Sequence, residues 1–272
     1  MSLEAAVTLE IDGGIADVRL NRPEKMNAVD EGIMTGLHSV LDQLEQDGSV
    51  RVVVLSGNGN AFCSGLDFSN FGDMLSGELD ADSAAEAYDD LSPAGANYAQ
   101  RIAWGWQELD VPVIAAVHGA AMGGGLNIAL GADIRIVHPE TKMGFVEITF
   151  GLLPDMSATQ SLRRIAALDR IKELVFTGRK FSGEQALEYG LATELSETPL
   201  EDALAMAKEI GRRNPEAVRR GKRLLNNSAL VSVHDGLIEE SDCSRQMIGT
   251  PDQLEAVMST FEKREPVYGK SS

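Results

Sequence analysis

The chain has 272 residues, 43% of them hydrophobic and 5% aromatic, so it is long enough to bury the core of one main domain. Its formal net charge of −18, from 42 acidic and 24 basic residues, argues against general nucleic-acid binding, which depends on lysines and arginines that neutralise phosphates. It has neither a membrane-spanning apolar run nor a secretory signal, and its cysteines and histidines lack disulfide or metal-ligand spacing. We therefore expect a soluble, cytoplasmic protein with no bound metal and no membrane or nucleic-acid partner.

The N-terminal part predicts a hairpin, a capped helix and a buried strand. Val7–Ile11 and Ile15–Leu20 flank the turn residues Asp12–Gly14, a pattern typical of a β-hairpin. Asp30 is placed to cap a following helix. The apolar positions of that helix recur at steps of three and four: Met34, Leu37, Leu41 and Leu44. The apolar run Val50–Leu55 then predicts a buried strand.

The rest of the chain alternates between strand and helix patterns before a helical end. Ser69–Ala99 is acidic and rich in small residues and predicts a surface insertion. Val113–Val117 and Ile134–Val137 predict strands on either side of the glycine-rich stretch Gly119–Gly131. Beyond Ser157 the sequence is mostly helical, with helix starts expected near Ser182, Pro199, Pro215 and Pro251. Short strands alternating with helices indicate βαβ units and a largely parallel sheet.

Two glycine-rich turns follow apolar segments. Gly123–Gly125 precedes the apolar stretch Leu126–Leu130, where glycines allow either close backbone approach to a ligand or close helix–strand packing. The spacing does not match the G-x-G-x-x-G pattern of dinucleotide-binding folds. Gly65 lies in a second such turn. Two turns of this kind can each aim one backbone N–H at the same oxygen, which is what an oxyanion hole requires.

Six segments in order along the chain together resemble the enoyl-CoA hydratase/isomerase (crotonase) family. They are Asn21–Ala28, Phe62–Asp67, Ile114–Gly119 with Gly123–Gly125, Ala132–Ile136, Phe145–Pro154 and Phe261–Arg264. The resemblance implies an α/β fold, a crotonase-like spiral of ββα units with a helical C-terminal region. It implies a core domain over residues 1–200 that holds the CoA and acyl site. Residues 201–272 are then a helical region involved in oligomerisation, as a homotrimer or a hexamer that is a dimer of trimers.

The resemblance also implies how the thioester of an acyl-CoA substrate is held. The oxyanion donors are the N–H groups of Leu66 and Gly124, which polarise the thioester carbonyl and stabilise an enolate. The residues implied in CoA binding are Lys25, Ala28, Ser64, Leu66, Phe261 and Lys263, the last two contributed by a neighbouring subunit. Arg22 is a further phosphate partner on grounds of charge. No cofactor is implied beyond the CoA moiety of the substrate.

The acid–base residues depart from the usual hydratase pair of glutamates. Glu147 matches the second glutamate, but Asn127, 20 residues before it, replaces the first, and an amide cannot transfer a proton at neutral pH. Asp155 follows Glu147 by 8 residues and supplies another carboxylate, as in dienoyl-CoA isomerases of the family. A capping box of Ser157 and Gln160 would supply the cap of the following helix without Asp155. We therefore expect Glu147 and Asp155 to move the proton.

Several functions stay open. Double-bond isomerisation by Glu147 and Asp155 is slightly favoured, and the alternative is hydration by Glu147 with a water held by Asn127. A CoA-thioester hydrolase, dehalogenase or ring-opening enzyme uses the same scaffold, and a non-catalytic RNA-binding member is a further alternative. Cys63 has no histidine partner that would make it a nucleophile, so it is expected in the core, and His118 is expected to be structural.

Overall fold

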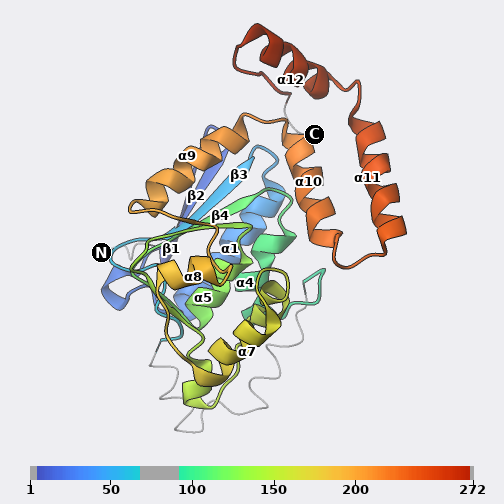
Figure 1. Ribbon diagram of the computed structural model, residues 1–272. Coiled ribbons are helices and arrows are strands. Elements are labelled where there is room, and N and C mark those ends of the chain that lie inside the picture. The colour runs from blue at the N-terminus through green and yellow to red at the C-terminus, as the bar shows by residue number, and fades with distance from the viewer. Residues whose placement is uncertain (1–4, 68–91, 270–272) are drawn as a thin grey trace.

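A six-stranded sheet forms the centre of the computed structural model, which describes residues 5–67 and 92–269 (Figure 1). Its strand order is β1-β2-β3-β4-β6-β8. The bounds are β1 Val7–Asp12, β2 Ile15–Leu20, β3 Val52–Gly57, β4 Val113–Val117, β6 Ile134–Val137 and β8 Glu194–Leu195. Strands β1 and β2 pair antiparallel, and each later pair of neighbours in this sheet is parallel. The largely parallel sheet predicted from the sequence is confirmed.

The hairpin and the capped helix predicted from the N-terminal sequence are both present in the structure. The β1–β2 turn contains Gly13 and Gly14, both in the left-handed region at φ 57° and 84°. Helix α1 spans Glu31–Gln46, and the carboxylate of Asp30 accepts a hydrogen bond of 2.9 Å from the Ile33 N–H. The predicted helix starts are also confirmed, since α9 Pro199–Gly211, α10 Pro215–Asn227 and α12 Pro251–Glu262 each carry proline in the first turn.

The remaining elements are short or irregular. Strands β5 Ala120–Met122 and β7 Lys142–Gly144 form a separate parallel pair that was not predicted, because three residues are too few for a period-two pattern. The others are η1 Pro23–Lys25, α4 Tyr98–Glu108, α5 Gly124–Gly131, η3 Glu147–Phe150, α6 Ala158–Leu162, α7 Leu168–Thr177, α8 Gly183–Glu188 and α11 Val233–Met247. Most of the predicted insertion, residues 69–91, lies outside the described residues, and its end forms the Asn97 capping box of α4.

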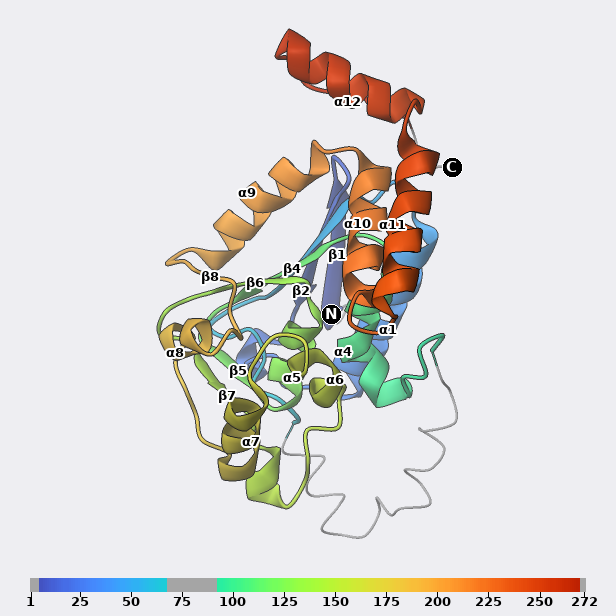
Figure 2. The same ribbon diagram turned by 45° about the vertical axis from the view of Figure 1, so that its right-hand side comes forward.

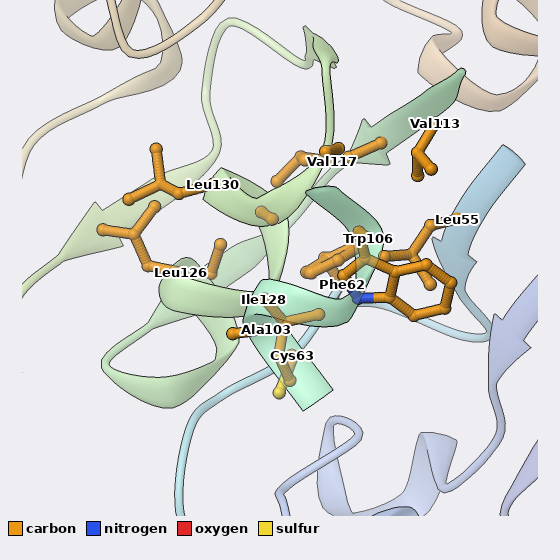
Figure 3. Close-up of a cluster of buried hydrophobic side chains, with 14 of the residues drawn as sticks. Leu55, Phe62, Cys63, Ala103, Trp106, Val113, Val117, Leu126, Ile128 and Leu130 are labelled. Carbon is orange, nitrogen blue, oxygen red and sulfur yellow. The ribbon is translucent and has the colours of Figure 1, made fainter. Parts of the chain in front are cut away.

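Helices cover the two faces of the sheet (Figures 1 and 2). Val53 and Leu55 of β3 belong to the larger core cluster, with residues of α1, α4 and α5. The intervening Val52 and Val54 pack with Ala203 and Ala207 of α9 on the other face. Because β3 is buried on both faces, it is a continuous apolar run rather than an alternating one. Figure 3 shows Trp106 and Phe62 packed near Leu55 in the larger cluster.

The C-terminal helices extend away from the sheet. Helices α10 and α11 lie side by side, and α12 projects beyond them in both views. Lys222 attaches α10 to the core, since its buried ammonium donates to the carbonyls of Trp106 and Val111 and pairs with Asp133 at 2.9 Å. The division predicted at residue 200 stays a prediction, and α9, which follows it, packs on the sheet.

Large apolar side chains are exposed on the last two helices and beside them. They are Val233, Leu237, Ile238, Ile248, Leu254, Val257, Met258 and Phe261. Such a surface is typical of a protein–protein contact.

Candidate active site

The first glycine turn, around Gly65, is held by hydrogen bonds on both sides. Ser64 N–H donates to Met26 O, and Val29 N–H donates to Gly65 O at 2.7 Å. Gly65 has φ 94°, and a Cβ on it would meet Met122 O at 2.7 Å. The position therefore requires glycine, both for its conformation and because the two turns are in backbone contact. Within the part of the chain that the structure describes, the N–H of the next residue, Leu66, has no acceptor.

The second turn begins helix α5. Gly123 has φ 49° and donates its N–H to Gly144 O, and Gly124 is the first helical residue. The N–H of a first helical residue has no acceptor inside its helix and lies at the positive end of the helix dipole. A Cβ on Gly125 would lie 2.4 Å from Cys63 O. The triple glycine thus serves close packing at Gly125 and leaves the N–H of Gly124 outside the helical hydrogen bonds.

Glu147 lies beside this second turn. It is the first residue of η3, and its Cδ and Oε1 atoms are 3.5 Å from where a Cβ on Gly123 would stand. Asn127 Nδ2 donates to Glu147 Oε1 at 3.1 Å. Burial raises the pKa of Glu147 above its ordinary value, the hydrogen bond from Asn127 opposes this shift, and the charge of Asp155 adds to it. Protonated Glu147 is therefore more abundant near neutral pH than an exposed glutamic acid would be.

Two acceptor atoms of this pair have no donor. Asn127 Oδ1 and Glu147 Oε2 are both buried and accept no hydrogen bond from a described residue. Buried acceptors are rarely left unpaired in proteins, and each unpaired one costs on the order of 1–3 kcal/mol. Each of them requires an O–H or N–H donor that the described residues do not supply.

Asp155 is exposed and lies close enough for its charge to raise the pKa of Glu147. Its backbone is fixed by a bond from its N–H to Leu153 O and by a bond from Gln100 Nε2 to its carbonyl. The predicted capping box of Ser157 and Gln160 is wrong. Ser157 adopts the left-handed region at φ 65°, and its hydroxyl makes no capping hydrogen bond.

Met156 was not identified from the sequence. Its Sδ lies 2.9 Å from where a Cβ on Gly124 would stand, so its thioether packs against the α-carbon of Gly124. The side chain is partly buried and packs against the larger core cluster. No sequence pattern distinguished it from an ordinary core methionine.

The residues expected to bind CoA fall into two groups. Lys25, Ala28 and Ser64 lie together, since Ser64 Oγ donates to Lys25 O at 3.4 Å and Ala28 N–H donates to the same carbonyl at 3.0 Å. Phe261, 84% exposed, lies on α12, and Lys263 caps that helix. Figures 1 and 2 show α12 well separated from α5, so one chain does not bring these two groups together.

Arg22 is engaged within the protein rather than free for phosphate. Its guanidinium pairs with Asp67 and Asp30, each at 3.2 Å, and donates to Ala28 O at 2.7 Å. This clamp was missed in the sequence because it joins residues 45 positions apart. It fixes the Lys25–Ala28 segment against Asp67, the residue next to Leu66.

Cys63 lies in the core, as expected, and His118 contacts the backbone. Cys63 is fully buried, and burial raises the pKa of its thiol to about 12, so it cannot supply a thiolate nucleophile near neutral pH. One ring nitrogen of His118 lies 3.0 Å from Gly59 O, in the turn after β3. Among residues 5–67 and 92–269 there is no group of three or more His, Cys, Asp or Glu arranged to hold a metal ion.

The site can be compared with known proteins. Residues 10–271 match the family model described as enoyl-CoA hydratase/isomerase. The chain belongs to this family. All of the candidate site residues lie inside the matched range. Among the described helices of this crotonase-family chain, none is long and apolar enough to cross a membrane.

Individual relatives agree with the family assignment. The enoyl-CoA hydratase domain-containing protein 2, mitochondrial, of Mus musculus is 35% identical over 94% of this chain and 84% of its own. The short-chain-enoyl-CoA hydratase of Clostridium acetobutylicum is 31% identical over 95% of each chain. The crystal structure of an enoyl-CoA hydratase from Bacillus anthracis superposes with a TM-score of 0.87 at 30% identity, covering 98% of this chain and 100% of that one. The crotonase fold expected from the sequence is confirmed, and the cytoplasmic location stays a prediction.

Proposed function

We propose that this crotonase-family chain isomerises a double bond in an acyl-CoA thioester through an enolate. One observation carries the proposal. Glu147, with a raised pKa, lies beside the Gly123–Gly124 turn and within the electrostatic reach of Asp155. A carbonyl bound at the N–H groups of Leu66 and Gly124 would place the acyl carbons next to both carboxyl groups.

The proposed steps need one proton acceptor and one proton donor. A carboxylate removes a proton from an acyl carbon, the C–H electrons move into the conjugated system, and the thioester oxygen becomes the enolate oxygen. A carboxylic acid then returns a proton to a different carbon, and the double bond has moved. The raised pKa of Glu147 suits it to hold the proton, and the exposed Asp155 is the second carboxyl group of the pair.

Hydration of a 2-enoyl thioester is the second candidate, and a different observation favours it. The unpaired acceptors Asn127 Oδ1 and Glu147 Oε2 fit a water molecule that donates to both. Glu147 would then accept a proton as that water attacks the acyl chain. The names of relatives from Mus musculus and Clostridium acetobutylicum, which contain enoyl-CoA hydratase, also support this candidate.

The proposal includes an oligomer, a homotrimer or a dimer of trimers. Phe261 and Lys263 would meet the CoA held by Lys25, Ala28 and Ser64 of a neighbouring subunit. The separation of α12 from α5 and the exposed apolar side chains of α11 and α12 support this arrangement. No cofactor is included beyond the CoA moiety of the substrate.

A panel of thioesters distinguishes the two candidates. The wild-type protein is mixed with 2-enoyl, 3-enoyl and 3,5-dienoyl CoA, and ultraviolet absorbance is followed. We expect turnover of 3-enoyl or 3,5-dienoyl CoA and its loss by about 100-fold or more in Asp155→Asn, the range for a general acid or base. Asp169→Asn, a change at another exposed aspartate, serves as the control. Consumption of 2-enoyl CoA alone, at a rate that Asp155→Asn leaves unchanged, would exclude isomerisation and favour hydration.

A further inference from the structure

A separate cavity lies at the opposite end of α5 from the glycine turns. It has a volume of about 560 Å³ and is lined by residues of α4, α6, α9 and α10 together with the C-terminal end of α5. That end of α5 is about 10 Å from Gly124 along the helix axis, at 1.5 Å per residue. The cavity shares no lining residue with the proposed acyl-CoA site. A volume of this size is in the range of small-molecule sites.

Two polar groups in this cavity are buried without a partner. Ser161 is only 6% exposed, and its Oγ makes no hydrogen bond with a described residue. The Nε of Arg164, just beyond the end of α6, is also buried and unpaired within the described chain. Both residues line the cavity. Two neighbouring donors left unpaired are unusual, because buried polar groups in native proteins are nearly always satisfied.

Arg164 is also an uncompensated positive charge. Its guanidinium lies 5.5 Å from the ring centroid of Trp104 and forms no ion pair in the described part of the chain. Burial lowers the pKa of Arg164, and the neighbouring Arg163 lowers it further, as expected for a cation without a counter-charge.

The other cations of the cavity are already engaged. Lys222 pairs with Asp133, and Arg213 pairs with Glu209 at 3.1 Å. Arg135, which also lines the cavity, donates to the carbonyls of Leu191 and Ala132, each at 2.7 Å. Among the described residues, the cavity therefore offers one guanidinium and one hydroxyl without a protein hydrogen-bond partner, and apolar walls that include Ile134, Ile165 and Leu225.

We propose that this cavity binds a small monocarboxylate with an apolar chain, of the fatty-acid type. The planar guanidinium of Arg164 matches a carboxylate, and the Ser161 hydroxyl can donate to the same group. The ring of Trp104 and the aliphatic walls accommodate the chain. The proposal is independent of the reaction at Glu147, because the two sites share no residue.

Octanoate is the probe for this site, and isothermal titration calorimetry on the full chain measures its binding. We expect binding to the wild-type protein and about ten-fold or more weaker binding to Arg164→Gln, since loss of a charge-assisted hydrogen bond is worth at least that factor. Arg163→Gln removes the same charge from an exposed neighbour that does not line the cavity, so its affinity should equal that of wild type. Ser161→Ala should weaken binding by a smaller factor. Octan-1-ol, which lacks the carboxylate, should bind more weakly than octanoate.

Three results would overturn the proposal. The first is octanoate affinity that Arg164→Gln leaves unchanged. The second is displacement of octanoate by coenzyme A or its loss in Glu147→Gln, which would place it in the acyl-CoA site. The third is no octanoate binding together with a lower mass of Arg164→Gln by light scattering, which would make the cavity an interface between copies of this chain.

Discussion

The enolate side of the candidate site is built from backbone, whereas the proton-transfer side is built from side chains. On the enolate side, Gly65 and Gly125 fit against Met122 and Cys63 so closely that no Cβ can be added without moving backbone. On the other side, Glu147 is held by one amide hydrogen bond, and Asp155 is exposed. A packed backbone permits one arrangement, while side chains can be exchanged without disturbing the fold. One scaffold can therefore keep its means of stabilising an enolate and change the reaction.

The largest expected effect lies on the side-chain half of the site. Glu147→Gln keeps the size of the side chain but removes its proton chemistry, so kcat should fall by about 100- to 10,000-fold. Binding of the substrate should change little, because the backbone donors are untouched. Steady-state kinetics on whichever thioester the wild type consumes would measure this. Retention of full activity would refute the acid–base role of Glu147.

A smaller loss is expected from the backbone half. Gly65→Ala forces a Cβ towards Met122 O and displaces the Leu66 N–H, and loss of one oxyanion donor lowers kcat by about 100- to 1,000-fold. Gly95→Ala is the matched control, because Gly95 has φ 87° but has no atom within 4 Å of an added Cβ. Equal kinetic losses in both variants would mean that backbone strain, rather than the position of the N–H, caused the effect.

The smallest effect concerns Asn127, which positions Glu147. Asn127→Leu removes the hydrogen bond that lowers the pKa of Glu147, so that pKa should rise further. In the proposed isomerisation protonated Glu147 is the acid, so activity falls as the pH rises through its pKa, and this basic limb of the profile should move to higher pH. A pH profile of kcat/KM measures the shift, with a loss of about ten-fold or less at its plateau. If this limb lay at the same pH in the wild type and in Asn127→Leu, the hydrogen bond from Asn127 would not control the pKa of Glu147.

The same contrast explains what the sequence could predict. Glycine turns, proline helix starts and the Asp30 cap depend on residues close in the chain, and each was placed correctly. The Arg22–Asp67 clamp and the Lys222–Asp133 pair depend on residues brought together by folding, and neither was identified. The Ser157 capping box failed because Ser157 adopts a left-handed conformation that its sequence does not indicate.

The separation of the two halves can be tested by enolate formation without turnover. Acetoacetyl-CoA, a thioester that ionises to a conjugated enolate, is added to the wild type, Glu147→Gln and Gly65→Ala, and the enolate band is recorded by ultraviolet difference spectroscopy. We predict an enolate band of similar size in the wild type and Glu147→Gln and a much weaker one in Gly65→Ala. A band that disappears in Glu147→Gln and persists in Gly65→Ala would contradict the assignment of enolate stabilisation to the backbone of the two glycine turns.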